Sequence, residues 1–173
     1  MKTLVLGGIK SGKSRQAEKI AVESGKQVVL IATATGDDEE MRQRISRHRQ
    51  SRPFDWLVIE EPLALATALN KYSVPGTCVI IDCLTLWLTN LLLRGDNTLL
   101  NDETSALIEL LGSNSDTIVM VSNETSMGII PMGELTRRFC DEAGLLHQRV
   151  AQCCDSVYLT VAGIPMCLKD KKQ

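Results

Sequence analysis

Short apolar runs alternate with longer amphipathic stretches along almost the whole chain. Runs this short and this apolar are typical of strands that are buried on both faces of a parallel sheet. The pattern predicts strands at Thr3–Leu6, Gln27–Ala32, Trp56–Glu60, Cys78–Asp82, Thr117–Ser122 and Ser156–Val161, with Ile164–Leu168 as an edge strand.

The stretches between these runs have helical spacing. They predict helices at Arg15–Ser24, from Asp37 to Pro53, from Leu63 to about Lys71, and at Leu84–Leu93, Asp102–Leu111 and Glu134–Cys153, the last with Gly144 as a candidate kink. Residues 94–101 and 123–131 are expected to be loops. Strands that alternate with helices predict a three-layer α/β domain with a mostly parallel central sheet, and 173 residues suit a single domain over 1–173.

The first strand leads directly into a G-x-x-x-x-G-K-[ST] motif. Its residues are Gly7, Gly8, Ile9, Lys10, Ser11, Gly12, Lys13 and Ser14. A strand before this motif and a helix after it predict a phosphate-binding P-loop, in which backbone N–H groups and the helix dipole face phosphate oxygens. Lys13 would reach the β- and γ-phosphates and Ser14 would ligate Mg²⁺, whereas a glycine-rich turn is the alternative.

Two later strands also end in residues that could serve a nucleotide site. Because ligands bind at the carboxyl ends of parallel strands, Thr33 and Thr35 are candidate nucleotide contacts, with a plain polar turn as the alternative. Asp82 ends an apolar strand, as the Mg²⁺-binding acid of a Walker B element does. Apolar strands that end in aspartate are common, so the Asp82 pattern alone is a weaker signal than the P-loop.

The predicted helix after Asp37 is unusually basic. It contains Arg42, Arg44, Arg47, Arg49 and Arg52, and among them His48, one of only two histidines in the chain. Spacing places His48 on the same face as Met41 and Ile45, so a partly buried histidine with solvated arginines explains the pattern as well as a catalytic role does.

Composition narrows the classes of function. A net charge of −2 and 3% aromatic residues argue against a general nucleic-acid binder. The N-terminus lacks the pattern of a signal peptide, and no apolar run reaches the roughly 20 residues that cross a bilayer, so we expect a cytoplasmic protein with no membrane span. Six cysteines without a C-x-x-C pair suggest buried thiols in a reducing compartment.

Several separated motifs together resemble one family. They are Gly7-Gly8 with Ser11 to Arg15, Ala32-Thr33, Arg44-Ile45, His48-Arg49, Arg52-Pro53, Trp56, Glu60-Glu61-Pro62, Asp82 to Thr85, Thr89 to Leu91, Asn123-Glu124, Gly128-Ile129, Pro131, Arg138-Phe139, Asp141, Gly144 and Gln148. In this combination the chain resembles the bifunctional adenosylcobinamide kinase/adenosylcobinamide-phosphate guanylyltransferases of cobalamin biosynthesis.

The resemblance implies two reactions on one P-loop domain. ATP or GTP would phosphorylate the aminopropanol hydroxyl of adenosylcobinamide, and GMP would then pass from GTP to that phosphate through a guanylyl-histidine at His48. It assigns catalysis to His48 and Lys13, Mg²⁺ to Ser14 and Asp82, and nucleotide binding to residues 7–15 with Thr33, Ala34, Thr35, Arg49, Arg52, Glu60, Glu61 and Asp82. It also points to a homo-oligomer, specifically a trimer, for which the strongly apolar segment Leu84–Leu93 is the only independent indication.

Two positions depart from the family pattern. Arg47 stands where some relatives have a second histidine, and His147 replaces the usual asparagine, which we interpret as a structural substitution. Lys13, Ser14 and Asp82 are all present, so we expect both activities. The alternatives are a small-molecule P-loop kinase without guanylyl transfer and a non-catalytic nucleotide-binding module.

Overall fold

The computed structural model describes residues 1–35, 39, 43, 55–114 and 116–171. Most of the predicted helix after Asp37, including His48, Arg49 and Arg52, therefore lies outside the described residues. The strands are β1 Lys2–Gly7, β2 Gln27–Ala32, β3 Leu57–Glu60, β4 Thr77–Asp82, β5 Thr117–Asn123, β6 Ser156–Val161 and β7 Ile164–Asp170. The helices are α1 Lys13–Glu23, α3 Leu65–Tyr72, α4 Leu84–Leu93, α5 Asn97–Ser113 and α6 Glu134–Cys153.

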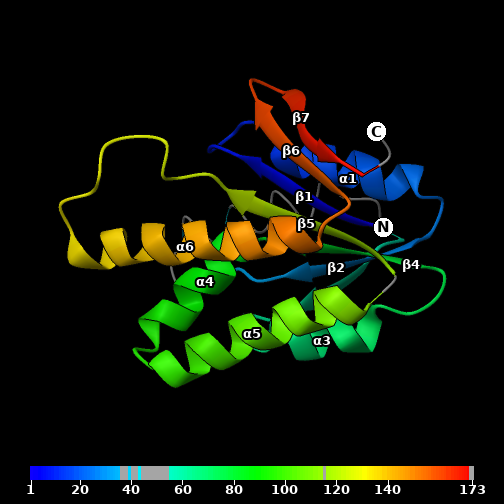
Figure 1. The fold of residues 1–173 in the computed structure, drawn as a ribbon. Helices are drawn as coiled ribbons and strands as arrows, with labels where there is room; N and C mark the ends of the chain where they lie inside the picture. The colour runs from blue at the N-terminus through cyan, green and yellow to red at the C-terminus, as the bar shows by residue number, and fades with distance from the viewer. Residues whose placement is uncertain (36–38, 40–42, 44–54, 115, 172–173) are drawn as a thin grey trace.

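All seven described strands form one sheet in the order β3-β2-β4-β5-β1-β6-β7 (Figure 1). Every pairing is parallel except that of β6 with β7, which is antiparallel. The P-loop strand β1 and the Asp82 strand β4 are thus both neighbours of β5. This order confirms the expected mostly parallel α/β sheet and brings the carboxyl ends of β1, β5 and β4 to the same edge.

Alternate residues of each central strand enter two separate apolar clusters. One cluster joins strand residues such as Leu4 and Ile81 to α3, α4, α5 and α6. The other joins strand residues such as Val5 and Ile80 to Ala17 and Ala21 of α1. Since side chains alternate across a strand, continuous apolar runs fill both faces, and three layers result.

The starts of three predicted helices are wrong: α1 begins at Lys13 rather than Arg15, and in the other two a carboxylate explains the difference. Helix α5 begins at Asn97 rather than Asp102, because Asp96 Oδ1 accepts bonds from the amides of Thr98 and Leu99 at 2.9 and 3.1 Å. Helix α3 begins at Leu65 rather than Leu63, because the amides of residues 63 and 64 bond to a glutamate side chain instead. Helix α6 continues unbroken through Gly144.

Helix α4 buries most of its apolar surface within the same chain. Leu84, Trp87, Leu88, Leu91 and Leu92 are all buried, whereas Leu93 is 66% exposed. The segment therefore gives no independent evidence for a second subunit, and the oligomer stays a prediction. Across the described residues, no helix combines the length and the apolar character that crossing a bilayer requires.

Candidate active site

The P-loop, residues 7–14, curls between the end of β1 and the start of α1. The Ser11 amide donates to the Gly8 carbonyl at 3.2 Å, and Gly12 has a φ of +94°, which is accessible mainly to glycine. A Cβ atom on Gly7 would lie 2.4 Å from Ser11 Oγ and 2.6 Å from the Thr160 carbonyl oxygen. Only glycine fits at position 7, so the curl depends on the sequence of the motif itself.

The turn between β6 and β7 supports the P-loop from outside. The Gly163 amide donates to the Ser11 carbonyl at 2.8 Å, and a Cβ atom on Gly12 would lie 3.1 Å from Gly163 Cα. Lys13 Nζ donates to the Gly8 carbonyl at 3.2 Å, which places the ammonium group over the loop. An ammonium group over a glycine-rich loop at a helix N-terminus is an arrangement of the kind that binds phosphates.

Three buried polar atoms near Gly7 have no hydrogen-bond partner among the described residues. They are Ser11 Oγ, Asn123 Oδ1 and Thr160 Oγ1. Asn123 and Thr160 are the register partners of Gly7 on its two sides, so these atoms surround the base of the loop. Buried polar groups are nearly always satisfied, and three unsatisfied ones at one place favour a bound polar ligand or ordered water there.

Asp82 ends β4 at the same edge of the sheet as the P-loop. The next residue, Cys83, reports on its surroundings, because burial raises the pKa of its thiol to about 11. The negative charge of Asp82 contributes to this rise, and the positive charge of Lys13 opposes it. Of the two strands that flank β5, Asp82 ends one and Lys13 follows the carboxyl end of the other, as a metal-binding acid and a phosphate-binding lysine would.

Thr33 has a structural role at the end of β2. Its buried hydroxyl donates to the Cys83 carbonyl at 2.7 Å and accepts from the Cys83 amide at 3.0 Å. Asn90 Nδ2 donates to the Thr33 carbonyl at 2.8 Å and to the Pro62 carbonyl at 3.1 Å. Thr33 therefore joins β2 to β4, and the half-buried Ala34 and Thr35 follow it along the rim.

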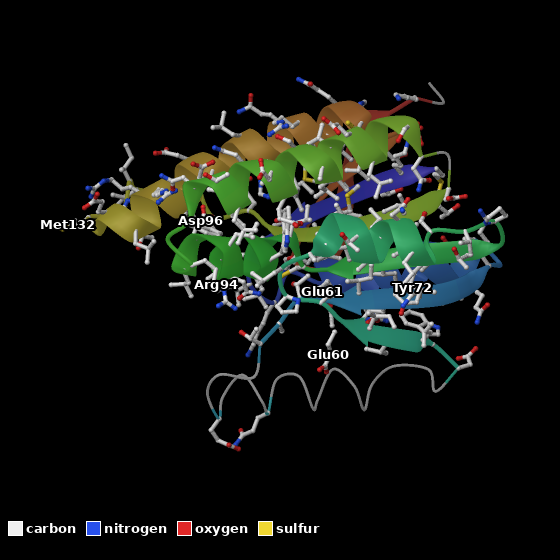
Figure 2. All side chains as sticks on the ribbon, turned by 90° about the horizontal axis from the view of Figure 1, so that it is seen from below. Glu60, Glu61, Tyr72, Arg94, Asp96 and Met132 are labelled. Atoms are coloured by element: carbon white, nitrogen blue, oxygen red, sulfur yellow. The ribbon has the colours of Figure 1, made fainter. Side chains whose placement is uncertain are left out.

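The two glutamates of the predicted nucleotide site lie at the far end of the sheet. Glu61 Oε1 accepts from the amides of Leu63 and Ala64 at 2.9 and 2.8 Å, which fixes the entry to α3. Glu60 is exposed at the end of β3, and Figure 2 shows it projecting away from α3 and α4. Strands β2, β4 and β5 separate β3 from β1, so the described residues do not bring Glu60 to the P-loop.

Sequence reasoning missed a polar network beside the P-loop, here called the Glu124 network: Thr85, Ser122, Glu124 and His147. His147 Nε2 lies 2.7 Å from Ser122 Oγ, and His147 Nδ1 lies 3.8 Å from Glu124 Oε2. Thr85 Oγ1 lies 3.2 Å from Ser122 Oγ. Burial lowers the pKa of His147, although Glu124 acts in the opposite direction. The sequence feature that could have indicated this network is the position of Ser122 and Glu124 at the carboxyl end of a strand.

The sequence of the chain is similar to those of known proteins. A family model described as cobinamide kinase/cobinamide phosphate guanyltransferase matches residues 3–168. The chain is 54% identical over 169 residues to the bifunctional adenosylcobalamin biosynthesis protein CobP of Pseudomonas aeruginosa, with 98% of each chain covered. It is 37% identical over 182 residues to the corresponding CobU of Escherichia coli, with 98% of this chain and 100% of the relative covered.

Solved structures resemble the fold at low sequence identity. The RadB recombinase matches with a TM-score of 0.53 and 16% identity over 91% of this chain and 73% of its own. The P4 protein of bacteriophage phi6, in complex with ADP, matches with a TM-score of 0.50 and 15% identity over 95% of this chain and 53% of its own. These likenesses support the P-loop fold alone.

Proposed function

Because the chain belongs to the cobinamide kinase/cobinamide phosphate guanyltransferase family, we propose that it performs two consecutive transfers. ATP or GTP donates its γ-phosphoryl group to the aminopropanol hydroxyl of adenosylcobinamide. GTP then donates GMP to that phosphate, which yields adenosylcobinamide-GDP and pyrophosphate. At the coarser level, the chain is a bifunctional enzyme of cobalamin biosynthesis.

The phosphoryl transfer is supported by the arrangement of the P-loop with Lys13 and Asp82. Phosphoryl transfer requires mainly positioning and neutralisation of charge on the phosphate oxygens. The Lys13 ammonium and the N-terminus of α1 supply positive charge at the P-loop, and Asp82 ends β4 at the same edge of the sheet. This convergence is the observation that carries the kinase assignment.

The residues around this site also suit Mg²⁺. The ion prefers a few hard oxygen ligands from the protein together with substrate phosphates and water. The half-buried Ser14 hydroxyl and the half-buried Asp82 carboxylate are oxygen donors of that kind, and together they would hold the ion. When bound, Mg²⁺ neutralises charge on the phosphate oxygens.

Guanylyl transfer needs a nucleophile, which we assign to His48. A neutral imidazole nitrogen forms a bond to the α-phosphorus of GTP while the bond to pyrophosphate breaks. A phosphate oxygen of adenosylcobinamide phosphate then attacks the same phosphorus and releases the imidazole. Arg49 and Arg52 would offset the charge on the phosphates. All three residues lie outside the described residues, so this assignment rests on the family alone.

Incubation with GTP labelled at the α-phosphate tests the covalent step. A guanylyl-histidine predicts label that stays on the denatured protein, survives base and is released by acid. A P-loop kinase without guanylyl transfer would retain no label, and that result would remove the second reaction from the proposal.

The variant His48→Ala separates the two chemistries. Guanylyl transfer should fall to background, because alanine cannot form a bond to phosphorus, while phosphoryl transfer should persist. Both reactions are assayed on one preparation together with a melting curve. Equal loss of both activities with a lowered melting temperature would mean that His48 has only a structural role.

We also propose that the enzyme is a homo-oligomer, specifically a trimer. Sedimentation of the purified protein tests this, and a stable monomer would contradict it.

A further inference from the structure

Glu124 lies directly beside the P-loop. It follows Asn123, the last residue of β5 and the register partner of Gly7, and its amide donates to the Gly7 carbonyl at 3.1 Å. One oxygen of its carboxylate is held, since Oε1 accepts from the Ser126 amide at 2.8 Å, while Oε2 faces His147 Nδ1 across 3.8 Å. The Glu124 side chain is 18% exposed, so solvent or a substrate still reaches it.

The Glu124 network continues into the wall of a cavity. Thr85 Oγ1 accepts from the Asn123 amide at 2.6 Å and lies 3.2 Å from Ser122 Oγ. Thr85 also lines a cavity of about 260 Å³ between α4 and the start of α6, whose other walls include Leu92, Leu93, Leu135 and Phe139. The cavity therefore lies on the α4 and α6 face of the sheet, whereas α1 packs against the opposite face.

The loop that begins at Glu124 exposes four large apolar side chains. Met127, Ile129, Ile130 and Met132 are exposed by 75, 96, 78 and 97%. Figure 1 shows the loop projecting outward between β5 and α6, and Figure 2 marks Met132 at its far end. Arg137 holds the loop against α6 by donating to the carbonyls of Pro131 and Met132. Contiguous exposed apolar residues next to a reaction centre are typical of a ligand-binding surface.

We propose that the phosphoryl acceptor binds on this α4 and α6 side of the P-loop and that Glu124 is the base for its hydroxyl group. This inference rests on the proposed kinase reaction. A cobinamide is a broad macrocycle with apolar faces and amide-bearing edges, and its apolar faces suit the apolar cavity and the exposed apolar side chains of the loop. The nucleotide phosphates occupy the P-loop, so the two substrates approach the transferred phosphoryl group from different sides.

The chemical step balances without another reactant. The acceptor oxygen forms a bond to the γ-phosphorus while the bond from that phosphorus to the β-γ bridging oxygen breaks. The bridging oxygen keeps the electron pair and leaves on the nucleoside diphosphate. Glu124 accepts the hydroxyl proton and later releases it to solvent. His147 acts as a positioning residue, because its Nδ1 faces Glu124 Oε2 at 3.8 Å while its Nε2 is hydrogen-bonded to Ser122 Oγ at 2.7 Å.

The variant Glu124→Gln tests the base directly, since glutamine keeps the shape but accepts a proton far less readily. General-base catalysis typically contributes about 10²- to 10⁴-fold, so we expect kcat for phosphoryl transfer to fall by about 10²-fold or more. Guanylyl transfer to pre-phosphorylated cobinamide should fall far less than phosphoryl transfer, because that acceptor has no hydroxyl proton to lose. The control is Glu134→Gln, which removes an exposed carboxylate in the first turn of α6.

The outcomes separate this inference from the proposed function. If the wild-type enzyme phosphorylates cobinamide and Glu124→Gln matches it, Glu124 is not the base. If the wild-type enzyme shows no phosphoryl transfer, the proposed kinase function itself fails. Glu124→Asp guards against misfolding, because it keeps a carboxylate and should retain more activity than Glu124→Gln at an equal melting temperature.

The acceptor side of the proposal has its own test in Leu135, which lines the cavity and is 52% exposed. Leu135→Ser should raise KM for cobinamide about tenfold and leave KM for ATP unchanged. Leu145→Ser is the matched control, because Leu145 lies on the same helix, is 57% exposed and is absent from the cavity walls. Equal KM values for cobinamide in the two variants would place the acceptor elsewhere.

The role of His147 is tested by comparing His147→Gln with His147→Ala. A positioning residue predicts a lowered kcat for phosphoryl transfer with unchanged KM for both substrates, and partial rescue by glutamine, which can still donate an N–H bond. A uniform loss in both transfer reactions that follows the melting temperature would make His147 purely structural.

Discussion

The P-loop and the Glu124 network meet at the bond from the Glu124 amide to the Gly7 carbonyl, but they are constructed differently. The P-loop consists of eight consecutive residues, and its shape follows from Gly7, Gly12 and the helix that starts at Lys13. The Glu124 network takes its side chains from α4, β5, the loop after β5, and α6. The P-loop therefore depends on one short segment of the sequence, whereas the neighbouring Glu124 network depends on residues from four separate elements.

The P-loop and the Glu124 network should differ in their sensitivity to mutation. A local motif fails when one of its own residues changes, because its backbone path depends on them. A dispersed network fails more gradually, because each member has contacts of its own that keep the fold in place. The variants below test this difference, from the largest expected effect to the smallest.

Lys13→Ala should have the largest effect on the P-loop side. Loss of the ammonium group over the loop removes a fixed positive charge from the transferred phosphate, and we expect kcat for phosphoryl transfer to fall by about 10³-fold with weaker triphosphate binding. Steady-state kinetics and a nucleotide titration measure both quantities. Unchanged kinase turnover would disprove the P-loop assignment.

Asp82→Asn should affect the metal requirement more than the fold. Removing one negative charge from a metal-binding group costs roughly 1.4 kcal/mol or more, so the Mg²⁺ concentration for half-maximal phosphoryl transfer should rise by about tenfold. A Mg²⁺ titration of both proteins at saturating nucleotide gives this shift. If the two curves coincide, Asp82 is only the residue at which β4 ends.

Gly7→Ala tests whether the P-loop depends on local backbone geometry. The new Cβ atom would lie 2.6 Å from the Thr160 carbonyl oxygen, which is backbone and cannot rotate away. We expect a loss of about 1–3 kcal/mol in the free energy of unfolding, measured by urea denaturation. Gly8→Ala is the control for stability, because a Cβ atom there meets nothing within 4 Å. Equal stability of the two variants would contradict the steric argument.

The smallest effect concerns the pH dependence that His147 contributes. Burial lowers the pKa of His147 from its ordinary value of 6.5. The unfolded chain therefore binds this proton more readily than the folded protein, so stability is lost as pH falls below about 6.5 and continues to fall down to the folded pKa. Urea denaturation at about pH 7.5 and about pH 5.5 should show a smaller acid loss in His147→Gln than in the wild type. An identical loss would mean that His147 titrates alike in both states.

Much of the secondary structure could be predicted because its signals are local. The bounds of β2, β6, α4 and α6 match the predicted ones, since apolar periodicity and nearby turn residues determine them. The starts of α3 and α5 were wrong, because a carboxylate of the preceding residues competes for the first helical amides. Such capping depends on side-chain geometry that periodicity does not contain.

Within the candidate site, the sequence by itself determined the P-loop, because the order of its glycines, lysine and serine specifies a backbone path. The sequence pattern could also predict that Asp82 ends a functional strand. It could not show that Asp82 and Lys13 belong to the same region of the site.

Only the tertiary structure decided which polar side chains are hydrogen-bonded within the fold and which face the site. The Thr33 hydroxyl is bonded to the Cys83 amide and carbonyl, whereas the nucleotide contact expected of Thr33 stays a prediction. His147 and Glu124 are 23 residues apart in sequence, and α6 must pack across the end of β5 before they meet. Strand order and helix packing create such contacts, and those follow from burial of the whole apolar surface rather than from any local pattern.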